Sequence, residues 1–500
     1  MIERAARNFL AQLATLGLAL VERIVLAGLL VRFWGADRFG EWALLLSFAG
    51  LIFLAEVGLN VHYGNAWQRM AAGGDRTGIA RLARVALGLA LGQGAMLLPA
   101  LLLFVFWTEA GAEDRTALLL LGLSAIANVM RGSVSQLYRV DNAFARGTLI
   151  AMVPTLGTVL GGFATVLAGG GVTVLAALHL LAQLGLGWGL LFADLRHRCP
   201  WIDLRPALPA RVEAHEILHG VKWLAPQQMA PVAWLQAPLL ILGALGITGA
   251  PLAGFVLMRT LTGFSRQIVT MASQAAALEL VGARHRGETA TLRSGLDAVT
   301  RLACIGVAAS GAALLAFGPN LVSLWTGDAA LFDPGVMVWL ALGALFAAPA
   351  MPLANLLTYS GQARIATEAL AAQIASALII AGVLTPAYGV AGMAAGLALG
   401  EGIGLCFLAS RLPGRMPWRT LMLCGGSVVW CLVVSVLVLH VFPAATAGDL
   451  ALGLVAWGLI GPLPLLAFAL RRDPLSDGLS RFPRSIRPAA LRSASENANS

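Results

Sequence analysis

The stretch "WALLLSFAGLIFLAEVGLNVHYGN", residues 42–65, begins as a long apolar run and then carries a carboxylate, Glu56. A charged side chain at the centre of a bilayer costs about 2.5–3.5 kcal/mol on insertion scales. Apolar runs of this kind recur along the whole chain, and each is long enough to cross the roughly 30 Å of bilayer hydrocarbon. The stretch therefore indicates a membrane-spanning helix whose single carboxylate needs a structural or functional reason.

The composition agrees with a membrane protein. The chain has 500 residues, of which 58% are hydrophobic and only 12% are charged, whereas soluble domains carry about 25% charged residues. Short strands of alternating polarity are absent, which excludes a transmembrane β-barrel. Five cysteines form no CxxC pair and four of them lie in apolar runs, which predicts small buried residues without a disulfide framework. The sequence therefore predicts an all-α, polytopic membrane protein.

The apolar runs predict about 14 transmembrane helices. They lie at 9–31, 41–61, 83–107, 116–138, 148–168, 172–193, 220–243, 251–275, 299–318, 335–358, 366–386, 388–410, 421–442 and 449–470. We group them into a six-helix lobe at 1–200, a second six-helix lobe at 201–412 and two additional C-terminal helices at 413–471. The remaining residues, 472–500, are polar and contain prolines, which predicts a disordered tail.

The basic residues predict the orientation of the chain. The net charge is +9, and the odd-numbered connections between spans hold only Arg32, Arg38 and Arg115. The even-numbered connections are rich in arginine, as in residues 68–84. By the positive-inside rule, both termini should lie in the cytoplasm, and we expect the protein to lie in the inner membrane. No predicted outside connection is long enough for a globular domain, so the function should lie among the helices, and the basic charge reflects topology rather than nucleic-acid binding.

Two weak self-matches suggest an internal repeat. Their offsets are 214 and 217 residues, and the matched pairs are Gly35/Gly249, Gly40/Gly254, Arg84/Arg301 and Gly94/Gly311. Chance similarity between helices rich in glycine, alanine and leucine is the alternative. A shared offset between separate segments favours duplication of a six-span unit, an architecture in which transporters bind their substrate at the interface of the two lobes.

Seven ionisable residues lie well inside the predicted spans, where such side chains usually face the bundle interior or a water-filled cavity. They are Glu22, Arg23, Glu56, Arg131, Arg259, Arg266 and Glu401. The four guanidinium groups are suited to bind a phosphate, which makes the arginines candidate substrate-binding residues. The three carboxylates are candidates for gating between lobes or for coupling transport to H⁺ or Na⁺. The alternative is that these cations and anions neutralise one another inside the fold.

The seventh predicted span combines prolines with amides. Pro226, Pro231 and Pro238 interrupt the helical hydrogen-bond ladder, and backbone groups freed in this way are tolerated where they line a cavity or find new partners. We therefore predict that three glutamines of this span line a cavity; they are Gln227, Gln228 and Gln236. A kinked helix with a structural role is the alternative.

One motif resembles a zinc site. His215, Glu216 and His219 form an HExxH pattern, which on a helix could hold zinc with the glutamate as a base. It lies next to a basic connection, and no third ligand follows at a defined spacing. An interfacial amphipathic helix is the simpler interpretation. We predict no metal, no organic cofactor and no catalytic residues, and an intramembrane zinc protease remains the least favoured alternative.

The segment at 28–65, "GLLVRFWGADRFGEWALLLSFAGLIFLAEVGLNVHYGN", resembles the first two spans of polysaccharide-transport flippases, including the O-antigen (Wzx-type) exporters. The shared elements are Gly35, Phe39-Gly40 and an acidic residue before Gly58-Leu59; family members often have Asp where this chain has Glu56. The segments 241–261 and 317–328 also fit. These motifs are loose, and the same superfamily contains lipid II flippases and multidrug-extrusion antiporters.

The resemblance implies a two-lobed transporter that exposes a central cavity alternately to each side of the membrane. It implies translocation of a polyprenyl-diphosphate-linked oligosaccharide for surface polysaccharide biosynthesis, with cavity cations receiving the diphosphate. The implied partners are the lipid-linked glycan, membrane lipids and the polysaccharide polymerase and assembly proteins. An ion-coupled antiporter of small molecules with the same fold is the alternative function, although four arginines within the spans suit a cationic drug poorly.

Overall fold

The computed structural model describes residues 2–140, 143–203, 205–222, 224–285, 287–360, 362–411, 418–442 and 447–471. Helices and short connections account for all of these residues, and no strand occurs among them. The all-α prediction is therefore confirmed. The predicted disordered tail, 472–500, lies outside the described residues.

The helices follow one another closely along the chain. The first half contains α1 (Ile2–Leu20), η1 (Val21–Leu26), α2 (Ala27–Trp34), α3 (Ala36–Gly50), η2 (Leu51–Glu56), α4 (Leu59–Ala72), α5 (Arg76–Trp107), α6 (Ala112–Ser135), η3 (Gln136–Arg139), α7 (Phe144–Leu167), α8 (Val172–Leu181), η4 (Ala182–Gly189), α9 (Leu190–Arg198), α10 (Arg211–Val221) and α11 (Ala225–Ala244). The second half contains α12 (Gly249–His285), α13 (Thr289–Thr326), η5 (Ala329–Leu331), α14 (Pro334–Tyr359), α15 (Ala363–Arg411), α16 (Trp418–Val441), α17 (Ala447–Ile460) and α18 (Pro462–Arg471).

The helices match the predicted membrane spans. Within the described residues, ten helices are long and apolar enough to cross a membrane. One of them is α15, whose 49 residues change direction at Gly389 (φ 58°, ψ −137°) and cover two predicted spans. Three further predicted spans fall on α11, α12 and the shorter apolar helix Gly425–Val441. Every predicted span thus coincides with a helix, and the chain is a multi-pass membrane protein.

The chain forms two compact units. The first, unit 1, comprises residues 1–260 together with 325–327 and 381–393; the second, unit 2, comprises 261–324, 328–380 and 394–500. The division into lobes at 1–200 and 201–412 with two further helices remains a prediction.

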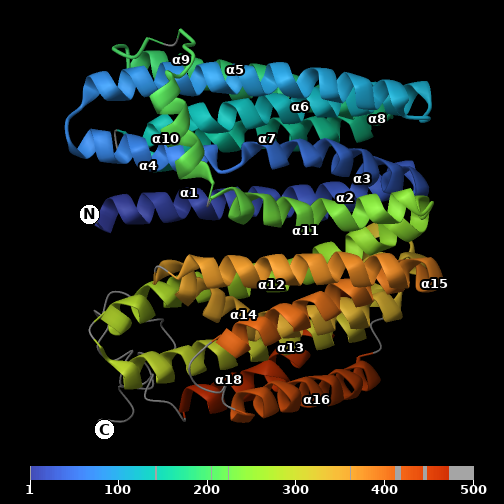
Figure 1. Ribbon diagram of the computed structural model, residues 1–500. Coiled ribbons are helices and arrows are strands. Elements are labelled where there is room, and N and C mark those ends of the chain that lie inside the picture. Colours follow the sequence, from blue (N-terminus) through green and yellow to red (C-terminus); the bar gives the residue numbers. More distant parts are fainter. Residues whose placement is uncertain are drawn as a thin grey trace. The chain divides into compact units, whose positions relative to one another are not determined.

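Unit 1 is built around α6, which packs against α3, α5 and α8. Helix α7 packs against α1 and α8, while α11 lies against α3 and η2. Figure 1 shows these helices running side by side along nearly the same direction. A buried aromatic core anchors α4, where Tyr63 and Trp67 are fully buried and stack with ring centroids 5.6 Å apart. The interior of unit 1 is therefore close-packed, and its polar groups need partners within the protein.

Unit 2 has apolar cores of its own. Helices α12, α13 and α14 meet around Val269, Cys304 and Ala348, and α13, α16 and α17 meet around Phe317, Val434 and Trp457. Cys431 is a free thiol, but Cys304 is disulfide-bonded. The prediction that the cysteines carry no disulfide is therefore wrong at Cys304, because spacing along the chain does not show which thiols helix packing brings together.

Three spans of unit 1 depart from a regular α-helix. The first and sixth spans contain π-helical turns, η1 and η4, and the second breaks between η2 and α4. At this break Val57 and Gly58 adopt left-handed backbone angles, with φ of 42° and 86°. Irregular helix turns within spans are often functional, so these positions define where the candidate site should be sought.

Candidate functional site

The break in the second span explains why a carboxylate is tolerated at position 56. The carboxylate of Glu56 accepts hydrogen bonds from the backbone amides of Gly58, at 3.1 Å, and Asn60, at 2.8 Å. Because the first amides of a helix lack intrahelical acceptors and carry partial positive charge, a carboxylate at the start of α4 is stabilised there. Nearby, the Gln93 side chain donates to the carbonyl of Ala55 at 2.8 Å. The charge thus completes the hydrogen bonding of an interrupted helix.

The proline-rich helix α11 provides the hydrogen-bond partners of Arg259. The guanidinium of Arg259 donates hydrogen bonds to the backbone carbonyls of Trp234 and Leu235. Pro238 has no N–H with which to satisfy the carbonyl of Trp234, four residues earlier. Arg259 therefore replaces a hydrogen bond that the proline removes, and this contact was not expected from the sequence.

The three glutamines of α11 are half-buried. The side chain of Gln236 packs directly on the backbone of α3 at Gly50, where a Cβ would lie 2.6 Å from its amide carbon. A glycine at position 50 is thus needed for this close approach. The prediction that Gln227, Gln228 and Gln236 line a cavity remains a prediction.

Arg131 is buried in the helix bundle of unit 1. Only 6% of the residue is exposed, and its Nη2 donates to the Asn128 side chain at 3.1 Å. Its Nε and the Oε1 of Gln183, in the π-helical turn η4, have no hydrogen-bond partner. Gly187 packs closely against both side chains. A Cβ built at this position would lie 3.2 Å from the Oε1 of Gln183 and 3.3 Å from the Cδ of Arg131. No carboxylate pairs with Arg131 among the described residues, so it leaves an uncompensated positive charge between α6, α7 and η4.

Glu22 and Arg23 lie in the other π-helical turn, η1. Glu22 is half-buried and Arg23 is exposed, and no ion pair involves Arg23 within the part of the chain that the structure describes. The indole of Trp325 donates to the carbonyl of Ile24 at 2.5 Å. A π-helical turn leaves carbonyls that lack a partner within the helix, and the Trp325 indole supplies a donor for one of them. Arg23 therefore lies in an irregular turn that a side chain from outside η1 stabilises.

In unit 2 the predicted cation Arg266 has a different environment. Its guanidinium forms an ion pair with Glu401. Glu401 is 3% exposed, whereas the side chain of Arg266 retains 25% exposure. Isolated buried carboxylates are very costly, and pairing with a hydrogen-bonded cation offsets this cost. Arg259 and Arg266, seven residues apart on one helix, thus have unrelated partners.

The HExxH motif lies on α10. His215, Glu216 and His219 are all exposed, and α10 instead buries Ile217 and Val221. Across the described ranges, no group of three His, Cys, Asp or Glu residues could hold a metal ion. This arrangement fits the interfacial amphipathic helix better than the zinc site.

A further contact in unit 1, between Asp37 and Ala250, was not predicted from the sequence. The carboxylate of Asp37 accepts a hydrogen bond from the backbone amide of Ala250, at 2.8 Å, and so caps α12 from α3. A Cβ at Gly40 would overlap the carbonyl of Gly249. Gly35 and Gly249, matched in the repeat, both have positive φ, 82° and 62°. The sequence match was interpreted only as a possible repeat, so no sequence signal predicted this junction.

Comparison with known proteins identifies the fold. No protein-family model and no curated protein matches the sequence. Among solved structures, the lipid II flippase MurJ in an inward closed conformation has a TM-score of 0.69 at 12% identity, covering 94% of this chain and 99% of its own.

Two further structures show the same fold. An inward-facing multidrug resistance MATE family transporter of the MOP superfamily has a TM-score of 0.64 at 18% identity and covers 80% of this chain and 94% of its own. A MOP superfamily transporter from Pyrococcus furiosus has a TM-score of 0.56 at 16% identity and covers 84% and 96%. The chain therefore has the fold of MOP superfamily transporters.

Proposed function

We propose that this protein is a flippase that moves a polyprenyl-diphosphate-linked oligosaccharide across the inner membrane by alternating access, for surface polysaccharide biosynthesis. The diphosphate and sugars would pass through the protein while the polyprenyl tail stays in lipid. Both termini would lie in the cytoplasm, and the polymerase and assembly proteins would act on the product. No covalent chemistry is needed.

The distribution of charge carries the proposal. Arg259 is bonded to the backbone of α11, and Arg266 is paired with Glu401. Arg23 and Arg131 remain as cations without an ion-pair partner in the described part of unit 1. Arg131 is buried and Arg23 is exposed, so Arg23 is the cation that a bulky head group can reach. A guanidinium stays ionised at any physiological pH and binds phosphate oxygens with two parallel N–H groups.

The extent of the fold match supports a lipid-linked substrate. The lipid II flippase covers 94% of this chain, whereas the multidrug transporter covers 80%. A small-molecule antiporter remains the second candidate because the multidrug transporter has the higher identity, 18% against 12%. Glu22 and Glu56 would then be the groups that bind a coupling H⁺ or Na⁺.

The first experiment is mass spectrometry of polyprenyl-diphosphate glycans in cells depleted of this protein. We expect one such lipid-linked glycan to accumulate on the cytoplasmic face, which would also identify the substrate. An unchanged lipid-linked pool, in a strain without a redundant flippase, would reject the flippase and favour the antiporter. Increased sensitivity to cationic dyes with normal surface glycan would then be the expected phenotype.

The site is tested separately by complementation. Arg23→Ala should prevent clearance of the accumulated glycan, because the head group loses its accessible cation, and Arg23→Lys should restore it only in part. Arg115→Ala is the matched control, because it removes another exposed arginine, in the first turn of α6. Full complementation by Arg23→Ala at normal membrane abundance would show that Arg23 does not bind the substrate.

A further inference from the structure

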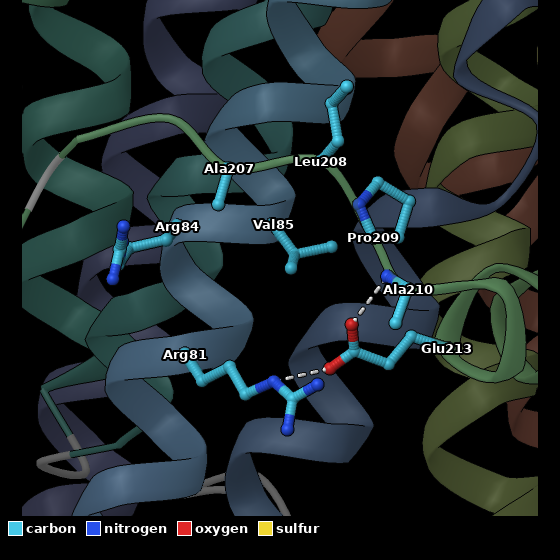
Figure 2. Close-up of a pocket in the computed structure, with 8 residues that line it drawn as sticks. All are labelled: Arg81, Arg84, Val85, Ala207, Leu208, Pro209, Ala210 and Glu213. Carbon is cyan, nitrogen blue, oxygen red and sulfur yellow. Dashed lines mark hydrogen bonds and ion pairs between the residues drawn. The ribbon is translucent and has the colours of Figure 1, made fainter.

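A pocket lies on unit 1 where the segment between α9 and α10 crosses α5. It has a volume of about 350 Å³ and is lined by Arg81, Arg84 and Val85 of α5, by Glu213 of α10 and by residues 207–210 of the crossing segment. Figure 2 shows the two arginines at one side of the pocket and the crossing segment along the other. The amide of Ala207 donates to the carbonyl of Arg84 at 2.9 Å, which fixes the segment on the helix.

The charges in the pocket do not cancel. Arg81 forms an ion pair with Glu213 at 2.7 Å, and the other carboxylate oxygen of Glu213 accepts the amide of Ala210 at 2.9 Å. Figure 2 shows the guanidinium of Arg84 pointing away from this pair. Its Nε reaches the carbonyl of Arg205 at 3.4 Å, and its two terminal nitrogens have no partner among the described residues. One positive charge with free donors therefore remains in the pocket.

The position of the pocket along α5 places it at the membrane surface. Helix α5 has 32 residues and is about 48 Å long at 1.5 Å per residue, whereas the hydrocarbon layer is about 30 Å thick. Arg81 and Arg84 lie in the first third of the helix, at the start of the span predicted at 83–107, which puts the pocket at the boundary between the hydrocarbon and the head-group layer.

Exposed apolar side chains lie at the pocket and on the segments that flank it in the chain. Leu208 is 83% exposed and Val212, the second residue of α10, is 71% exposed. Arg76 lies over the ring of Trp201, 5.8 Å from its centroid. Apolar side chains beside arginines and a tryptophan are typical of surfaces that sit between head groups and acyl chains.

We propose that this pocket binds the phosphodiester head group of an anionic phospholipid of the surrounding bilayer. The terminal nitrogens of Arg84 donate to the phosphate, and Leu208 and Val212 contact the upper acyl chains. Basic pockets at the membrane surface of multi-pass proteins bind such lipids. The site lies outside the predicted transport pathway and would be present whichever substrate the protein carries.

The test is lipid binding to the purified full-length protein in nanodiscs, measured by native mass spectrometry. We expect phosphatidylglycerol to be retained over phosphatidylcholine, and Arg84→Gln to lower its apparent affinity about fivefold, the effect of losing one interfacial cation. Arg84→Lys should lower the apparent affinity less than Arg84→Gln does, because lysine keeps the positive charge but lacks the planar guanidinium with its two parallel N–H donors. Arg115→Gln, the matched control, should bind as the unaltered protein does.

Several outcomes would overturn the proposal. Equal retention of phosphatidylcholine, or equal binding by Arg84→Gln and the unaltered protein, would show that no anionic head-group site exists there. An equal loss in Arg115→Gln would indicate a general effect of surface charge. Displacement of the lipid by inorganic phosphate at similar concentration would identify free phosphate, rather than lipid, as the ligand. Thermal unfolding of each variant in the same nanodiscs separates loss of binding from loss of folding.

Discussion

Glu56 accepts a hydrogen bond from the backbone amide of Asn60 at 2.8 Å, across the break between η2 and α4. The carboxylate that interrupts the apolar second span therefore hydrogen-bonds two backbone amides at the start of the helix that follows it, whose N-cap residue is Gly58. For comparison, a side chain at the N-cap position that accepts a hydrogen bond from such an amide stabilises a helix by about 0.5–2 kcal/mol in soluble proteins. The cost of a charge within the span is offset by two backbone amides that would otherwise lack acceptors.

Glu56→Ala should lower the thermal stability of the protein, because both amides lose their acceptor. Glu56→Gln keeps one carbonyl oxygen and should recover most of the stability. Thermal unfolding in detergent measures both, and the clearance assay above measures transport. If Glu56 instead carries a coupling ion, Glu56→Gln will abolish transport while its unfolding temperature stays normal.

Arg259→Ala should destabilise the protein by about 1 kcal/mol, the net worth of a typical hydrogen bond, because the half-buried carbonyl of Trp234 loses its donor. In a Pro238→Ala background the same change should cost less, because the alanine amide can bond the carbonyl of Trp234. A double-mutant cycle on unfolding free energies measures this coupling. Zero coupling, with loss of substrate binding in both backgrounds, would instead assign Arg259 to the substrate.

Arg266→Ala should destabilise unit 2 strongly, by about 3–5 kcal/mol, because the buried carboxylate of Glu401 loses its partner. The double variant Arg266→Met with Glu401→Leu should fold nearly as well as the unaltered protein. Folded yield by size-exclusion chromatography and unfolding temperature test both. A well-folded double variant without transport would show that the pair acts in the transport cycle rather than in folding alone.

Gly40→Val should separate α3 from the start of α12, because a Cβ at this position overlaps the carbonyl of Gly249. Overpacking of this kind costs about 1–3 kcal/mol. Gly92→Val is the matched control, since a Cβ at Gly92 meets nothing within 4 Å. Equal unfolding temperatures for the two variants would show that the close contact contributes nothing to stability.

Much of the fold could be predicted because its signals are local. Apolar length marks a span wherever it occurs, so all fourteen predicted spans fall on helices. Local patterns failed where the chain leaves the α-helix: the π-helical turns at Val21–Leu26 and Ala182–Gly189 have no distinctive composition, since they depend on neighbouring helices.

The sequence by itself determined that the protein is an all-helical membrane protein and which intramembrane residues carry charge. Only the tertiary structure decided what each charge does. Arg259 and Arg266 share a helix face, yet one meets carbonyls freed by a proline and the other meets a carboxylate 135 residues away. A charged side chain removed from water needs a hydrogen-bond or ion-pair partner inside the protein. Helix packing decides which group lies close enough to be that partner, and the spacing of residues along one helix does not.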